Sequence, residues 1–447
     1  MQRRSFLQLI GAGGVALAAR PLFAAAAAAP STDEFFIFIH AAGGWDVTLW
    51  ADPRNEKKGI VDPASSENTD TAPLSHWTAQ KLEGETETFK ILEAGGLRLG
   101  PGIGDLIDLH DRLTIVNGLA MNTVSHPDGT SFSCTGRHLA GGRSPAASID
   151  VALTNELGTG QLLPDVAIGF PAAYVGEHLD RRAIPLRVSN AGTIAKSLAR
   201  SDAYLKEDDR AAITALLTDE AHDLAKRSVY PETFERLASQ ETALPHLLGN
   251  ELKTAFTPKA LQDTYTGFDY KGKNIGAGAL GGAFAIEAMK RNLVRCVGFA
   301  LGGLDTHNQN YKQHAHTQQE IFGTIGTLVK LLDGTPHPTK RGAKLSDHTH
   351  ILVFSDFCRT PQINLSGGRD HYPNNSALVI SPKFVGGKTF GKTDHEQVLP
   401  ADAGLNFSDG ARPIAPPDLL ATFLSAFQIE PRKYLRDGEV VKAMLRG

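Results

Sequence analysis

The stretch "VRCVGFALGG" at residues 294–303 is the segment from which we predict the fold. Its β-branched, leucine and phenylalanine residues run without polar alternation, which is typical of a strand buried on both faces. Three other runs share this character: "FFIFIHAAGG" (35–44), "LTIVNGLA" (113–120) and "THILVFSDF" (349–357). Strands of this kind predict a mostly parallel sheet that is covered by helices on both faces.

Amphipathic stretches between these strands predict helices at 146–157, 209–227, 282–293, 311–332 and 416–427. Strand alternating with helix indicates one α/β domain over residues 31–447, with a doubly wound, mostly parallel sheet flanked by helices. Within it, short strand-like runs and polar helices over about 165–275 predict a helical insertion over one end of the sheet. We expect the glycine-rich "GKNIGAGALGGAF" (272–284) to form its exit loop.

The first thirty residues have the pattern of an export signal. Arg3 and Arg4 precede a short apolar run and an alanine tract with several small-x-small cleavage sites, so residues 1–30 resemble a twin-arginine signal peptide. Arg20 and Pro21 interrupt the apolar run, so we expect no stable membrane span, although an N-terminal anchor helix is the alternative. This predicts a periplasmic or secreted protein whose first partner is the twin-arginine export machinery.

Charge and cysteine content exclude several classes of protein. The formal net charge is −4 and no basic stripe stands out, which argues against nucleic-acid binding. The cysteines are Cys134, Cys296 and Cys358, and none forms a CxxC pair, which argues against a disulfide scaffold and a thiolate zinc site. We expect Cys296 to be a buried apolar residue, and a Cys134–Cys358 bridge after export remains an alternative.

An acid follows each of the four predicted strands, and a histidine follows three of them within about fifteen residues, at the end of the sheet where ligands of open α/β sheets collect. An aspartate after a strand, taken alone, is more often a helix cap or a turn residue than a ligand. Together they predict a metal site built from oxygen and nitrogen ligands, with zinc expected and calcium, manganese or magnesium as alternatives. The residues concerned are His40, Asp46, Ser125, His126, Asp128, Thr130, Ser131, Asp305, His307, Asp356, Arg359, Asp370 and His371.

The order of these residues resembles that of the alkaline-phosphatase-like superfamily, which includes sulfatases, phosphatases and phosphoglycerate mutases. The resemblance covers roughly residues 35–430. It rests on Asp46, "SHPDGTSFSCTGRH" (125–138), "GGLDTH" (302–307), "VFSDF" (353–357) and His371. More closely, "GGLDTHNQ", "SDFCRTP…GGRDHYP" and "VGGKTFGKTD" are similar to a family of exported bacterial proteins within that superfamily, a domain of unknown function.

The resemblance implies a set of metal ligands. Asp46 matches the carboxylate after the first strand, Asp305 and His307 match an Asp–His pair, and Asp356 and His371 match two later ligands. The superfamily pairs the later aspartate with a histidine, but that position is Phe357 here. The sequence therefore predicts that one metal ion has lost a ligand.

The position of the nucleophile departs from the superfamily pattern as well. Counting back from "TGR" (135–137) by the sulfatase spacing leads to His126, although Ser125 and Thr130 offer hydroxyl groups nearby. Three interpretations stay open: the nucleophile has moved, His126 is a ligand or a base, or covalent chemistry has been lost. Arg359 would either clamp a phosphate or sulfate group or form a strand-end salt bridge.

The resemblance implies an exported metal-dependent hydrolase that acts on a small phosphate or sulfate ester. The alternative is a non-catalytic exported binding or assembly protein that keeps the fold with a degenerate metal site. Phe357 and the unclear nucleophile favour the alternative, whereas the retained aspartates and histidines favour the hydrolase.

Overall fold

The computed structural model describes residues 33–54, 91–158, 160–197, 207–229, 231, 234, 250–308 and 310–447. The predicted export signal at 1–30 lies outside these residues. In the described part of the chain, no helix combines the length and the apolar character that crossing a membrane requires.

An eight-stranded sheet forms the centre of the molecule, in the order β12-β4-β11-β8-β1-β7-β5-β6. Strand β11 runs antiparallel to its neighbours β4 and β8, while the other strands are parallel to one another. The predicted α/β class with a mostly parallel sheet is therefore confirmed. The strands are β1 (Phe35–Ala41), β4 (Leu113–Ala120), β5 (Asp165–Ile168), β6 (Leu186–Val188), β7 (Cys296–Leu301), β8 (Thr349–Ser355), β11 (Asn374–Ile380) and β12 (Lys388–Phe390).

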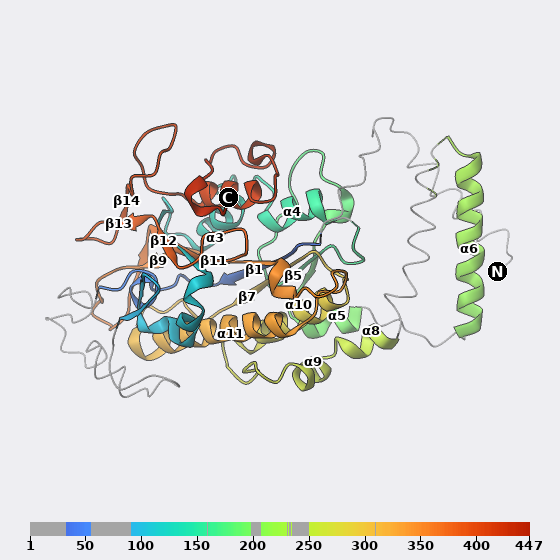
Figure 1. Ribbon diagram of the computed structural model, residues 1–447, viewed down its shortest axis with the longest axis horizontal. Coiled ribbons are helices and arrows are strands. Elements are labelled where there is room, and N and C mark those ends of the chain that lie inside the picture. Colours follow the sequence, from blue (N-terminus) through green and yellow to red (C-terminus); the bar gives the residue numbers. More distant parts are fainter. Residues whose placement is uncertain are drawn as a thin grey trace.

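Helices cover both faces of the sheet, as Figure 1 shows: α10 and α11 lie on one side, and α3, α4 and α12 lie on the other. Strand β1 explains why both faces need cover. Its Phe35 and Ile37 belong to one hydrophobic core, whereas Phe36 and Phe38 belong to the other. The α-helices are α3 (His126–Thr135), α4 (Ile149–Leu157), α5 (Ala191–Ser197), α6 (Glu207–Arg227), α8 (Asn250–Ala255), α9 (Pro258–Thr264), α10 (Gly276–Lys290), α11 (Ala315–Gly334) and α12 (Pro416–Ser425).

The glycine-rich stretch at 272–284 is not the loop that the sequence predicts, because α10 begins at Gly276. A Cβ atom on Gly278 would lie 2.2 Å from a side-chain carbon of Leu301, and one on Gly281 would lie 2.9 Å from Phe299. The glycines therefore let the helix lie directly on β7. Close packing against the sheet stabilises a helix that the propensity of glycine disfavours.

The range expected to hold a helical insertion contributes to the sheet as well. Strands β5 and β6 form its end beside β7, and α5, α6, α8 and α9 follow along the chain. Strand β11, "NNSALVI", was not among the predicted strands. It lies in the middle of the sheet, between β4 and β8.

Two carboxyl groups meet in the core between α4 and β5. Asp150 and Asp165 are 0% and 1% exposed. Burial raises the pKa of both groups, and the neighbouring charge of Asp150 raises that of Asp165 further. Above a pH of about 4, the two carboxyl groups lose their protons in the unfolded chain but keep them in the folded chain. The free energy of unfolding therefore falls as pH rises through this range.

We predict that Asp165→Asn stabilises the fold more at pH 8 than at pH 4.5. The change removes a carboxyl that resists ionisation, so we expect a gain of about 1 kcal/mol or more in the free energy of unfolding at pH 8. Denaturant unfolding at both pH values measures it, with Asp105→Asn at an exposed position as the control. An equal effect at both pH values would contradict the raised pKa.

Candidate metal centre

One edge of the sheet collects the predicted residues because of strand direction. The parallel strands β1, β7 and β8 end there, and the segments after β7 and β8 carry Asp305 and Asp356. Strand β4 ends at the same edge and leads into α3, whose first residue is His126. Because β11 is antiparallel, its beginning lies at this edge, and it brings His371 of the short strand β10 (His371–Tyr372) to the others.

Glycines allow these segments to approach one another closely. A Cβ atom on Gly129 of α3 would lie 2.2 Å from the main-chain oxygen of Asp356. Gly43 follows β1 with a φ of +113°, and a Cβ atom there would lie 2.4 Å from the main-chain nitrogen of Asp305. Larger residues at either position would push the helix or the loop away from the edge of the sheet.

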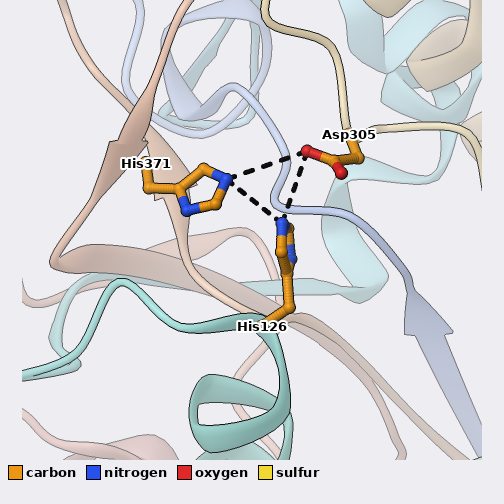
Figure 2. Close-up of side chains that lie close together, drawn as sticks. All are labelled: His126, Asp305 and His371. Atoms are coloured by element: carbon orange, nitrogen blue, oxygen red, sulfur yellow. Dashed lines mark hydrogen bonds and ion pairs between the residues drawn. The ribbon is translucent and has the colours of Figure 1, made fainter.

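Three side chains from separate elements converge on one point, as Figure 2 shows. The Nε2 atoms of His126 and His371 lie 3.1 Å apart. Asp305 places Oδ1 at 3.3 Å from Nε2 of His126 and at 3.7 Å from Nε2 of His371. Ligands of a tetrahedral zinc ion, each about 2.0–2.1 Å from the metal, lie about 3.3 Å from one another. The spacing of the three atoms therefore fits one such ion.

The hydrogen bonds behind the two imidazoles set their tautomers. Nδ1 of His371 lies 2.8 Å from the carbonyl oxygen of Val124, which only accepts, so the Nδ1–H of this ring donates. Nδ1 of His126 lies 2.7 Å from Oδ2 of Asp356 and donates likewise. In the neutral rings both Nε2 atoms then carry lone pairs that face each other, an arrangement that a shared cation stabilises.

Asp356 orients His126, and it is not one of the three converging groups. Both its oxygens accept hydrogen bonds, from the ring nitrogens of His40 and His126, from the Thr130 hydroxyl at 3.0 Å and from the Gly43 amide at 3.1 Å. Burial alone would raise the pKa of Asp356, but the charge of His40 and the bond from His126 lower it far below its usual value. The carboxylate in turn raises the pKa of His126.

Phe357 forms the apolar floor of the cluster. Its fully buried ring lies 4.7 Å from the ring centre of His126 and 4.6 Å from that of His371. The resemblance implies a histidine at this position, and the structure has a hydrophobic side chain there that packs against the two imidazoles. The described residues at this edge therefore fit a single ion.

Arg359 forms an ion pair with Asp305, as in the salt-bridge alternative that the sequence left open beside the phosphate or sulfate clamp. One terminal nitrogen donates to Oδ1 of Asp305 at 2.8 Å, and the guanidinium is 1% exposed. Burial opposes ionisation of Asp305, but this bond and the nearby His126 lower its pKa below the usual value. The other acceptors of the guanidinium are the carbonyl oxygens of Gly43, Gly44, Leu304 and Arg369 and Nε2 of His307.

His307 stands beside the cluster as a third imidazole. Its Nδ1 lies 2.7 Å from Oδ1 of Asp370, and its Nε2 lies 3.3 Å from Oδ1 of Asp305. The centre of its ring is 4.9 Å from that of His371. Asp370 thus sets the tautomer of His307.

Asp46 is not brought to the cluster, although the resemblance implies that it is a ligand. It is completely buried, and its oxygens accept from Thr48 at 2.6 and 2.9 Å and from the Asn310 amide at 2.7 Å. Nε of Arg369 lies 3.0 Å from the same carboxylate. Asp46 therefore caps a short helical turn and neutralises a buried arginine.

The residues considered as nucleophiles are placed in different ways. Thr130 is held by its bond to Asp356, while Ser125 is an exposed residue that precedes α3 without capping it. Cys134, Cys296 and Cys358 are all buried and free, so the alternative Cys134–Cys358 bridge is absent. His126, to which the sulfatase spacing leads, points its Nε2 into the cluster.

A polar cavity of about 820 Å³ opens beside the cluster. Its far wall comes from the glycine-rich segment before α10 and from the start of α11, where the sequence predicted structure but no site residues. Glu320 lies there with its carboxylate 3.3 Å from Nε2 of His316. The lining residues are Ala42, Gly43, His126, Lys273, Asn274, Gly303, Asp305, Thr306, Gln313, His316, Thr317, Glu320 and Asp356.

Comparison with known families gives one match over most of the chain. Residues 34–439 match the family described as "Protein of unknown function (DUF1501)". No curated protein matches the sequence.

Solved structures show a distant likeness. "Crystal structure of Ps i-CgsB in complex with k-i-k-neocarrahexaose" is 13% identical, with 91% of this chain and 75% of that chain covered and a TM-score of 0.36. A protein from "Metabolism of multiple glycosaminoglycans by bacteroides thetaiotaomicron is orchestrated by a versatile core genetic locus" is 8% identical, covers 88% and 72%, and has a TM-score of 0.32. At these scores the likeness has no bearing on the chemistry of the cluster.

We predict that Zn²⁺ stabilises the native protein through this cluster and that a chelator removes the effect. An ion that binds only the folded chain adds about 2.7 kcal/mol when its concentration is a hundred times the dissociation constant. His371→Ala and His126→Ala should abolish the zinc-dependent rise in melting temperature. Asp356→Asn should keep the ligands but weaken zinc binding by about 10–100-fold, since it changes the group that orients His126.

The control for this titration is His348→Ala. His348 precedes β8 at the opposite edge of the sheet, where its ring bonds to Glu34. An unchanged zinc response in His371→Ala, or its loss in His348→Ala, would place the binding site elsewhere.

Proposed function

We propose that this chain, which belongs to the DUF1501 family, is an exported metal-dependent hydrolase that acts on a phosphate or sulfate ester of a hydrophilic alcohol. The observation that carries the proposal is the convergence of three ligand atoms from His126, Asp305 and His371 at the mouth of a polar cavity. In each imidazole, the Nδ1–H donates to an acceptor and so fixes the orientation of the ring, as in protein metal sites. The acceptors are Asp356 for His126 and the carbonyl oxygen of Val124 for His371.

The donor set favours zinc among the divalent ions. Two imidazole nitrogens and one carboxylate oxygen form a ligand group typical of catalytic zinc, which leaves a position open for substrate. Zinc held there would supply Lewis-acid polarisation of an ester and would make water a stronger acid near neutral pH. Calcium and magnesium prefer oxygen ligands, so they fit these two histidines less well.

Residues of the chain supply the remaining requirements of a hydrolysis. Arg359 fixes the Asp305 carboxylate, and Asp356 fixes the His126 ring, so both ligand atoms are preorganised. His307 is half exposed beside them, with Nδ1 bonded to Asp370 and Nε2 facing the Arg359 guanidinium. To pass a proton to the leaving ester oxygen, the ring would exchange its contact with Arg359 for one with that oxygen.

The described residues favour direct attack by water over a covalent intermediate. The histidine at the nucleophile position points its lone pair into the cluster, and the Thr130 hydroxyl is bonded to Asp356. This supports the interpretation that His126 is a ligand and that the covalent step of the superfamily has been lost.

The cavity lining indicates the substrate class. None of the lining residues is Phe, Tyr, Trp or a large aliphatic residue, and Lys273 supplies a positive charge among the carboxylates of Asp305, Glu320 and Asp356. Pockets for aryl or acyl groups are lined mainly by apolar side chains, so this cavity suits a polar alcohol attached to an anionic ester. Its volume of about 820 Å³ leaves room for an organic group beyond the phosphate or sulfate itself.

Export remains part of the proposal through Arg3 and Arg4. A protein carried folded by the twin-arginine machinery can bind its metal before it leaves the cytoplasm. The alternative function is that of an exported binding protein with a degenerate metal site. One observation supports it: Phe357 stands where the resemblance implies a histidine ligand.

We expect zinc-dependent release of phosphate from glucose 6-phosphate, or of sulfate from glucose 6-sulfate, by the purified full chain. Chelator and His371→Ala should each reduce the rate of phosphate or sulfate release by at least about 100-fold, since each removes the metal or a ligand. His348→Ala should retain the rate. Zinc binding without turnover of either ester would contradict the hydrolase and leave the binding protein as the function.

Lys273→Ala should raise KM for the active ester by about tenfold or more while kcat changes little. A hydrogen bond to a charged group is worth about 1.5–3 kcal/mol, and here it would act on ground state and transition state alike. Lys271→Ala is the matched control, because Lys271 is exposed on the same loop but does not line the cavity. Equal KM values for the two variants would exclude Lys273 from substrate binding.

A further inference from the structure

Helix α6 carries a row of large apolar side chains that face solvent. Ile213, Leu216, Leu217 and Leu224 are 44%, 66%, 36% and 38% exposed, and we call them the leucine stripe. Figure 1 shows α6 at one edge of the molecule, apart from the central sheet and from α10 and α11.

The covered side of the same helix has small residues. Ala221 and Ala225 are 1% and 5% exposed, and Thr214 and Thr218 beside them are partly covered. A surface helix ordinarily turns its large apolar side chains inward and its small or polar ones outward. The reversed arrangement, with leucines in solvent, is typical of a helix whose outer face meets another protein.

We propose that the leucine stripe is a dimer interface, in which α6 packs antiparallel against α6 of a second copy of this chain. The charges at the two ends of the stripe favour this occupant. Asp209 and Arg227 are 18 residues apart, which is five turns at 3.6 residues per turn, so both project from the same side of the helix. On that side they flank Leu216 and Ile213.

An antiparallel pair with a two-fold axis uses these charges twice. The axis passes near the middle of the helix, where Leu217 of each copy lies against the other copy. Asp209 then faces Arg227 of the partner subunit, and the same contact recurs at the other end. Ile213 likewise lies near Leu224 of the partner subunit. The surface is thus complementary to itself in both shape and charge.

Other occupants fit the helix less well. Residues 207–227 hold six acidic and three basic side chains, so an anionic membrane surface would repel the helix. A helix of 21 residues is roughly 30 Å long, and one helix pair buries less than the roughly 1,200 Å² of a standard interface. The dimer is therefore reversible, with a dissociation constant on the order of micromolar. The proposal is independent of the metal centre.

Sedimentation equilibrium of the full chain over a wide concentration range tests the proposal. We expect a monomer–dimer equilibrium, and Leu217→Glu should raise the dissociation constant about a hundredfold, because the change acts in both copies. Ile184→Glu is the control, since Ile184 is 52% exposed on a different part of the surface. Leu217 is exposed, so its replacement should leave the melting temperature of the monomer unchanged.

Charge reversal distinguishes the antiparallel pair from other dimers. Asp209→Lys alone or Arg227→Glu alone should weaken association about tenfold, and the two changes together should restore it. Asp208 and Lys226 are also five turns apart, but each is two and a half turns from Leu217 and so faces away from the stripe. Reversing that pair should change nothing.

Four outcomes would overturn the proposal. They are a chain that stays monomeric at every concentration, a dimer insensitive to Leu217→Glu, a double reversal that fails to restore association, and a Leu217→Glu monomer with a lowered melting temperature. The last outcome would show that the leucine stripe packs against another part of its own chain.

Discussion

Both oxygens of the buried Asp356 carboxylate accept hydrogen bonds, and these bonds join three separate parts of the chain. His40 and Gly43 come from the end of β1, whereas His126 and Thr130 come from α3. A charge this far from water is tolerated only when its acceptor sites are filled, so each donor must stay where it is. The carboxylate therefore fixes the start of α3 relative to the edge of the sheet.

The orientation of the three converging side chains follows from this hydrogen bonding of Asp356 and from two other hydrogen bonds. His126 receives its direction from Asp356, Asp305 from the buried Arg359, and His371 from the carbonyl oxygen of Val124. Side chains that are already fixed by such hydrogen bonds lose little conformational entropy when an ion binds, and this strengthens binding. The polar cavity opens beside these atoms, and the proposed function places the substrate there.

Several residues considered as metal ligands or as a phosphate clamp make their bonds within the protein. Asp46 and Arg359 have the residue types that metal and phosphate sites use, but both are buried and bonded within the protein. Asp356 orients the ring of His126 and is not one of the three converging groups. Residue type shows only which bonds a side chain can make. Burial and the neighbouring donors decide which bonds it does make, and those neighbours come from distant parts of the chain.

The sequence by itself determined the α/β class, the four long strands and the edge of the sheet where polar side chains gather, because these depend on local hydrophobic patterns and on strand direction. It also supplied His126, Asp305 and His371 among the candidates. Only the tertiary structure selected these three as neighbours and showed Phe357 beneath them, because β11 lies antiparallel between β4 and β8 and carries His371 to that edge. Pairing between strands far apart in sequence leaves no periodic signal in either strand, so the fold had to be seen before the ligands could be chosen.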